Sequence, residues 1–157
     1  MWLKGQFIPK DLPKRRDVIF IGEKPSLYFI RHPKERYKGN YNATSTDFVF
    51  QNWIRKYLKQ GVFVTDMVKT EGKAGASFER EWRKDNRFRR KLFEELRTYK
   101  PKIIVIMSNK AKELFLSDPQ FLHWRTRAHK IYHPSHVARF RKFDEWDMQF
   151  SEIVKNL

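Results

Sequence analysis

The chain has 157 residues, enough for one domain with a core of its own, and we expect residues 1–157 to form a single domain. It contains no cysteine, which excludes disulfides, thiolate metal sites and iron–sulfur clusters. Its 34 Lys and Arg against 18 Asp and Glu give a formal net charge of +16. This excess favours a polyanion as partner, and nucleic acid before an acidic membrane or protein.

The sequence also carries no sign of a membrane or secretory destination. No apolar run approaches the length of a membrane span, and the first residues lack the layout of a signal peptide. We therefore expect a protein that works inside a cell, in the cytoplasm or nucleoid, or in the nucleus if the source is eukaryotic.

Four apolar runs are predicted to be β-strands. The first, residues 18–22, reads as buried on both faces and ends abruptly at a glycine, a glutamate and a proline. Runs 62–66, 103–107 and 130–133 also end in polar residues. Helical stretches separate the runs, which predicts an α/β fold with a four-stranded parallel sheet whose strand ends gather at one edge. Ligands bind at this edge in open α/β sheets, so Glu23 is a candidate active-site carboxylate.

Two segments before the first helical stretch are predicted to be irregular. Residues 1–16 are basic, contain two prolines and indicate an extended arm or loop, either a solubilising flank or a contact to phosphates. Residues 27–45 have no sustained period and are predicted to be a long loop that walls a binding pocket. Tyr41 in this loop is either the stacking face of the pocket or a surface aromatic.

Helical periodicity appears in four stretches. One helix begins near Thr46 and ends before Gly61, a second runs from Ser77 to Tyr99, and a short third covers 109–116. The second has many basic residues on its outer faces, which fits both a solvated surface and phosphate neutralisation. The last helix is predicted to bury six apolar residues on its inner face: Phe143, Trp146, Phe150, Ile153, Val154 and Leu157.

The loop at residues 69–75 contains two glycines and two lysines. It lacks the full Gly-x-x-x-x-Gly-Lys-Ser/Thr pattern and does not follow its strand directly, which argues against a nucleotide-binding P-loop. Basic contacts from this loop to a phosphate remain open.

Taken together, the four strand ends resemble the uracil-DNA glycosylase superfamily, most nearly the branch whose first motif reads Gly-Glu-Ala-Pro-Gly. Residues 22–26 (Gly-Glu-Lys-Pro-Ser) stand in that place, and residues 133–135 (His-Pro-Ser) match the second motif. Residues 62–69 are similar to the strand that ends Thr-Asn-Val-Val-Lys, and residues 100–107 to the third strand. The resemblance spans nearly the whole chain and implies a three-layer α/β/α fold. It departs from the branch at Ser26, which replaces a glycine, and in lacking the cluster cysteines.

The resemblance implies a role for two candidate catalytic residues. Hydrolysis of an N-glycosidic bond needs a carboxylate for the attacking water and a donor for the oxygen of the departing base. Glu23 would take the first role and His133 the second. The alternatives are a structural loop carboxylate for Glu23 and a core or helix-entry histidine for His133.

The resemblance also implies a set of DNA contacts. A base must leave the stack before such a site can reach it, and an apolar wedge often holds the space it vacates. Val137 stands where the family carries its wedge; Phe140 is a second candidate, and a core role is the alternative for both. Ser135 would hold a phosphate through its hydroxyl and backbone amide. The predicted DNA-binding residues are Lys24, Pro25, Ser26, Lys69, Ser135, His136, Val137 and Arg139.

Asp66 occupies the place of an asparagine that reads the base, so Asp66 and Tyr41 are the predicted base-binding residues. An asparagine amide offers one donor and one acceptor to uracil, whereas an ionised aspartate offers acceptors only. Either burial raises the pKa of Asp66 so that it donates, or the substrate presents two donors. The remaining alternative is that Asp66 caps its loop and another group reads the base.

The resemblance implies a monofunctional DNA glycosylase of base excision repair that flips and hydrolytically releases uracil or a related deaminated or modified base. The alternative is a catalytically weak or inactive nucleic-acid-binding member of the same fold. A phosphoesterase would need clustered carboxylates or histidines for metal, which the sequence does not supply. We expect DNA, single- or double-stranded, as the partner, no metal or other cofactor, and a monomer.

Overall fold

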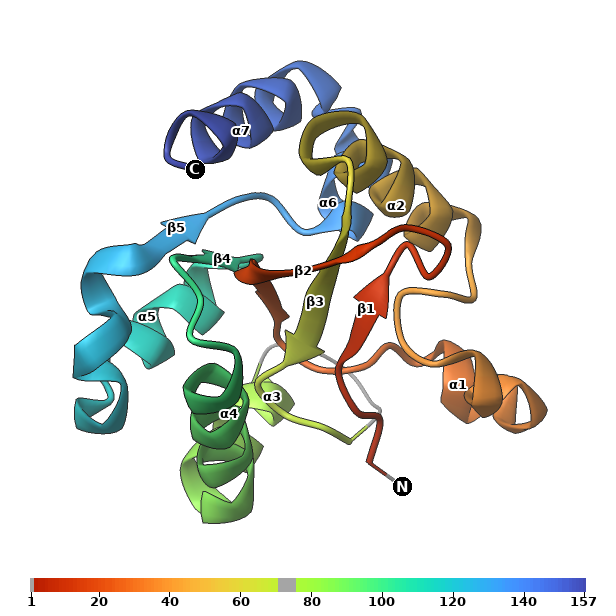
Figure 1. Ribbon diagram of the computed structural model, residues 1–157. Helices are drawn as coiled ribbons and strands as arrows, with labels where there is room; N and C mark the ends of the chain where they lie inside the picture. Colours follow the sequence, from red (N-terminus) through yellow and green to blue (C-terminus); the bar gives the residue numbers. More distant parts are fainter. Residues whose placement is uncertain (1, 71–75) are drawn as a thin grey trace.

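The computed structural model describes residues 2–70 and 76–157 and shows a central five-stranded sheet between two layers of helices (Figure 1). The strands are β1 (Gln6–Ile8), β2 (Lys14–Gly22), β3 (Gly61–Asp66), β4 (Ile103–Ile106) and β5 (Ala128–Lys130). Their order in the sheet is β1-β3-β2-β4-β5. The pairs β2–β3, β2–β4 and β4–β5 are parallel. The predicted α/β fold with a parallel sheet and the three-layer arrangement are thus confirmed.

Two details of the sheet differ from the expectation. A fifth strand, β1, adds antiparallel to β3 at the edge, so part of the expected basic arm belongs to the sheet. This strand has three residues, too few for a periodic signal, and its partner lies more than fifty residues later in the chain. The last strand lies at 128–130 rather than 130–133, although the Ile131 amide still donates to the Ile106 carbonyl at 3.0 Å.

One helical layer packs on the first face of the sheet and consists of α2 (Ser45–Leu58), α6 (Pro134–Phe140) and α7 (Phe143–Lys155). A capping box starts α2, because the Thr44 hydroxyl accepts from the Asp47 amide and the Asp47 carboxylate accepts from the Thr44 amide. The apolar faces of these helices meet the inner side of β2 and β3. This half of the core is centred on Phe20, Phe50, Trp146 and Phe150.

The second layer covers the other face with α3 (Ala76–Lys84), α4 (Asn86–Tyr99) and α5 (Asn109–Ser117). The single helix expected from 77 to 99 is wrong, because the chain breaks at Asp85, whose extended backbone and carboxylate cap α4 through the Arg87 amide. The expected inner face of α7 is correct for Trp146 and Phe150. The expectation is also correct for Ile153, which is buried. It is wrong for three residues that remain partly exposed: Phe143, Val154 and Leu157.

The remaining elements are α1 (Tyr28–Arg31) and two 3₁₀ segments, η1 (Pro33–Lys38) and η2 (Pro119–Arg127). The expected long loop at 27–45 is therefore partly helical. Among the described residues, no helix is both long and apolar enough to cross a membrane.

Candidate active site

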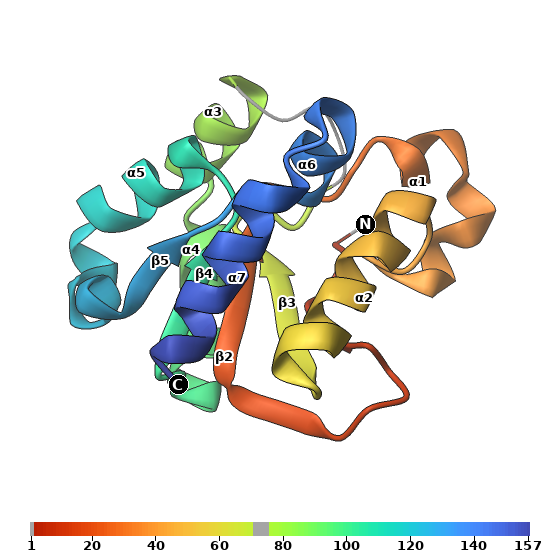
Figure 2. The same ribbon diagram turned by 90° about the horizontal axis from the view of Figure 1, so that it is seen from above.

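The carboxyl ends of the parallel strands meet at one edge of the sheet, which α1, α3 and α6 surround (Figure 2). Gly22 pairs with Asp66 across β2 and β3, and the Met107 amide donates to the Ile21 carbonyl at 2.9 Å. The first side chains past the strands therefore gather there, as the parallel pattern predicts.

Glu23 leaves β2 at this edge with its side chain half-buried. Its Oε1 accepts a hydrogen bond from the Ser108 hydroxyl at 2.8 Å, and its carbonyl accepts from the Val68 amide at 2.9 Å. The Ser108 oxygen also caps α5 by accepting from the Ala111 amide at 2.9 Å. That cap leaves the hydroxyl proton for Glu23, so one carboxylate oxygen is fixed while the group can still accept from a water.

His133 follows β5 and caps α6. Its Nδ1 accepts from the Ser135 amide at 3.1 Å, and the Ser135 hydroxyl lies 2.7 Å from the same nitrogen. A backbone N–H can only donate, so Nδ1 carries no proton and the neutral ring carries its proton on Nε2. Burial, with a smaller effect of His136, lowers the pKa of His133 to about 4. The ring is thus a neutral Nε2–H donor at neutral pH.

Tyr41 is buried and is not a surface aromatic. Its ring centroid lies 6.2 Å from that of His133 and 5.7 Å from that of Phe50. The hydroxyl donates to Asp66 Oδ1 at 3.0 Å, and burial together with the Asp66 charge raises the pKa of Tyr41. A Cβ at position 22 would overlap the Tyr41 hydroxyl and Asp66 Oδ1, which explains the glycine there.

Asp66 lies at the end of β3 with its carboxylate buried. The Tyr41 hydroxyl donates a hydrogen bond to Asp66 Oδ1, and the Asn40 side-chain amide donates to Asp66 Oδ2 at 2.5 Å. Burial raises the pKa of Asp66 to about 6, against the opposing effects of the Lys69 charge and these two hydrogen bonds. The site residue that sequence reasoning missed here is Asn40. Its place beside Tyr41 was the one available signal.

Lys69 is a correction to the predicted DNA contacts. Its ammonium is buried, lies 2.9 Å from Glu95 Oε2, and also donates to the Thr65 hydroxyl and the Asp66 carbonyl. Burial lowers the pKa of Lys69, and the Glu95 charge opposes that change. An ammonium held in this way cannot reach a phosphate. Residues 71–75 of the same predicted loop lie outside the described residues.

Lys24 is a second correction, since its side chain is only 2% exposed and pairs with Glu81 on α3 at 2.7 Å. Pro25 beside it is also buried, and neither residue forms a surface for DNA. Ser26 is exposed, and its hydroxyl oxygen accepts from the Tyr28 amide at 3.0 Å at the start of α1.

On α6 the predicted wedge is wrong, because Val137 is fully buried in the core under the helix. Phe140, the second candidate, is 52% exposed and lies one turn further along α6. The His136 ring packs 4.8 Å from its ring centroid, and the Arg139 guanidinium lies 5.2 Å above it. Ser135 is exposed beside them. This end of α6 therefore combines an exposed aromatic ring with positive charge.

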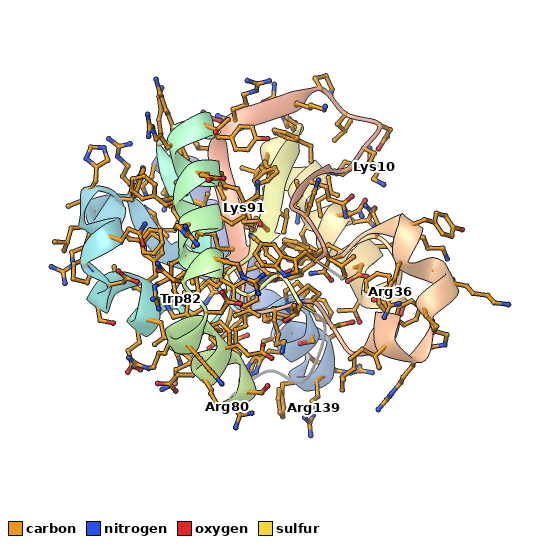
Figure 3. The ribbon with its side chains drawn as sticks, turned by 90° about the horizontal axis from the view of Figure 1, so that it is seen from below. Lys10, Arg36, Arg80, Trp82, Lys91 and Arg139 are labelled. Atoms are coloured by element: carbon orange, nitrogen blue, oxygen red, sulfur yellow. The ribbon has the colours of Figure 1, made fainter. Side chains whose placement is uncertain are left out.

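Basic side chains from other elements flank the same edge. Figure 3 shows Arg80 on α3 and Arg139 on α6 projecting outward, and the two helices belong to opposite layers of the fold. Such a rim suits a polyanion that lies across the strand ends. In the described part of the chain, no group of three or more His, Asp or Glu side chains is arranged to hold a metal ion.

Comparison with known proteins agrees with this architecture. A search of curated proteins gave no match. The family model described as the uracil DNA glycosylase superfamily matches residues 9–157, nearly the whole chain. The strand-end motifs lie within that range, in the order that the sequence resemblance requires. This protein therefore belongs to the uracil DNA glycosylase superfamily.

Proposed function

We propose that this protein is a monofunctional DNA glycosylase that releases uracil or a related damaged base from DNA during base excision repair. The observation that carries the proposal is that a hydroxyl-anchored Glu23, after β2, and a neutral, Nε2-protonated His133, after β5, lie at the same edge of the sheet. The Tyr41 ring lies beside His133, with the ring centroids 6.2 Å apart, and its hydroxyl donates to Asp66 at the end of β3.

These two groups match the charge changes of base hydrolysis. As the bond between C1′ and the base nitrogen breaks, positive charge grows on the deoxyribose and negative charge on the base. Glu23 orients a water and accepts its proton as the water oxygen bonds to C1′. The Nε2–H of His133 donates a hydrogen bond to the base oxygen where negative charge accumulates. Neither step needs a cofactor.

The remaining site residues serve the DNA in this proposal. The base swings out of the stack and packs against Tyr41, while Phe140 enters the space it leaves. Ser135, with its exposed hydroxyl, holds a neighbouring phosphate, and Arg139 adds positive charge beside it. The net charge of +16 supplies the general attraction to the backbone.

The test is a panel of oligonucleotides that each carry one uracil or one other deaminated or modified base, with abasic sites revealed by alkaline strand cleavage. We expect release of at least one base by the wild type and loss of most of that activity in Glu23→Gln at unchanged DNA affinity. His133→Ala should lower the rate by about 2.7–4 kcal/mol, the loss typical of an oxyanion-hole donor.

Glu152→Gln is the matched control, because Glu152 lies near the end of α7 and its ion pair with Lys155 is exposed. Wild-type rates in both Glu23→Gln and His133→Ala would place the active site elsewhere. Salt-sensitive DNA binding without release of any base in the panel would instead identify the alternative, a catalytically silent nucleic-acid-binding member of the family.

A further inference from the structure

Helix α3 contacts the loop that carries Glu23 through an ion pair whose lysine is buried. The Lys24 ammonium lies 2.7 Å from Glu81 Oε2, and the two residues are 57 positions apart in the chain. The exposed fractions of the two side chains differ sharply: 2% for Lys24 and 36% for Glu81. The cation is therefore inside the protein, and α3 brings the anion to it.

The same helix also reaches the other group that holds Glu23. Glu79 on α3 lies 3.4 Å from the Lys110 ammonium in the first turn of α5. Ser108 caps that turn and donates to the Glu23 carboxylate. Two residues of the same turn of α3, Glu79 and Glu81, thus contact both elements that position Glu23: the N-terminus of α5 and its own loop.

Two large apolar side chains fix α3 on the sheet. Phe78 and Trp82 are buried in the second half of the core, and the Trp82 ring stacks on Phe121 at 5.8 Å. Glu79 and Glu81 flank this anchored stripe along the helix. The carboxylates are therefore held by a packed element and not by a free surface helix.

This ion pair matters more than an ordinary surface ion pair because its lysine is buried. Exposed pairs contribute little because water solvates each ion when the other is lost. A buried cation without its anion is strongly unfavourable, so Lys24 would leave the interior to reach water. Since Lys24 is bonded directly to Glu23, that movement displaces the carboxylate.

We propose that Glu81 is a positioning residue for Glu23, acting through Lys24. The inference rests on the proposed function, because it assigns to α3 the alignment of the carboxylate that orients the attacking water. A displacement of about 1 Å at a reacting group can cost about 100-fold in rate. The pair therefore governs the rate of base release and leaves DNA affinity unchanged.

The central experiment compares Glu81→Ala with Glu145→Ala. Glu145 is the matched control, because its exposed fraction of 41% is close to that of Glu81 but its partner Lys142 is 42% exposed. For each variant, single-turnover base release and the Kd for DNA are measured, together with hydrogen exchange of the Val68 amide. This amide donates to the Glu23 carbonyl, so its exchange reports the order of the Glu23 loop without any activity.

We expect Glu81→Ala to slow base release by at least about tenfold at unchanged Kd, to speed exchange at Val68, and to leave the protein folded. Glu145→Ala should match the wild type in all three measurements. The double variant Lys24→Met with Glu81→Met should restore slow exchange and most of the rate, because an apolar pair of similar size removes the buried charge.

The measurements test the positioning role of Glu81 independently of the proposed glycosylase activity. Unchanged exchange at Val68 and an unchanged rate in Glu81→Ala would overturn the positioning role. A double variant that stays as impaired as Glu81→Ala would also overturn it, since the unpaired Lys24 would not be the cause. If the wild type releases no base, the proposed function fails, and the exchange at Val68 still decides whether Glu81 orders the loop.

Discussion

The Tyr41 hydroxyl donates to Asp66 Oδ1 at 3.0 Å, and this bond ties the aromatic wall of the site to a carboxylate whose pKa is raised to about 6. Asn40 donates to the other oxygen, so the ionised carboxylate satisfies both donors. A proton on Asp66 needs an acceptor of its own, which the Tyr41 oxygen supplies only if its hydroxyl turns away. The protonation state of Asp66 therefore sets where the Tyr41 proton points.

The first prediction concerns the pH dependence of uracil release. The ionised Asp66 offers only acceptors and repels the uracil O4 acceptor, whereas the protonated acid, or an asparagine, supplies a donor. We expect wild-type release of uracil to be weak at pH 7.5 and to rise as the pH falls through about 6. Asp66→Asn should release uracil faster at pH 7.5 and show no rise near pH 6.

Single-turnover rates on uracil-containing DNA between pH 5 and pH 8 check this prediction. Glu145→Gln is a suitable control, because Glu145 lies on α7 in an exposed pair with Lys142. Strong, pH-independent release by the wild type that Asp66→Asn does not improve would rule out the role of Asp66 in base selection.

The second prediction concerns stability and follows from the depressed pKa of His133. The folded-state pKa of about 4 lies below the usual 6.5, so the unfolded chain binds the proton more tightly. The resulting stability is fully present above pH 6.5 and is lost as the pH falls toward 4. The difference between 6.5 and about 4 corresponds to about 3 kcal/mol.

Asp66 has the opposite sign, because its folded-state pKa is raised from 3.8 to about 6 and its contribution is lost as the pH rises through 6. The two contributions offset each other in the wild type. We therefore expect His133→Gln, made in an Asp66→Asn background, to flatten the rise in unfolding free energy between pH 4 and pH 7. Urea denaturation across this range measures it, and an unflattened rise would show that His133 titrates normally.

The third prediction separates Phe140 from Val137. Phe140 is half-exposed, so Phe140→Ala should cost little stability and should slow release from duplex DNA more than from single-stranded DNA, where no stack needs to be held open. Val137→Ala leaves a cavity in the core and should lower the unfolding free energy by about 2 kcal/mol. Equal effects of Phe140→Ala on both substrates would argue against a wedge.

The fourth prediction concerns the salt dependence of DNA binding. Log affinity should fall with log salt at a slope of about −0.9 per phosphate neutralised on duplex DNA. Arg139→Gln, which removes an exposed charge, should reduce the slope by about 1. Lys69→Gln removes a buried charge and should leave the slope unchanged, while costing about 3–5 kcal/mol of stability because Glu95 loses its partner.

Titration of a labelled duplex between low and physiological salt checks the slopes, and thermal unfolding checks the cost of Lys69→Gln. A flat salt dependence of the wild type would remove the electrostatic part of the proposed function. A reduced slope in Lys69→Gln would show that this lysine reaches the DNA after all.

The sequence by itself determined the parallel part of the sheet and the edge at which the candidate site lies. Apolar runs with abrupt polar ends are local patterns, and strands alternating with helices are compatible with few topologies, so Glu23 and His133 could be assigned to strand ends. The charge of +16 likewise needed no structure to indicate a polyanion. The family resemblance came from motifs of three to five residues in the same local segments.

Only the tertiary structure decided which charged and apolar side chains face the solvent. The resemblance implied DNA contacts for Lys24 and Lys69, but each is buried against an anion that a helix far along the chain supplies. The resemblance placed Val137 as a wedge, but the packing of α6 on the sheet buries it.

Long-range hydrogen bonds in the site also came only from the tertiary structure. The Ser108 hydroxyl bonds to Glu23, 85 positions away in the chain, and the Asn40 amide bonds to Asp66, 26 positions away. Such pairings depend on how the layers pack, which local periodicity does not encode.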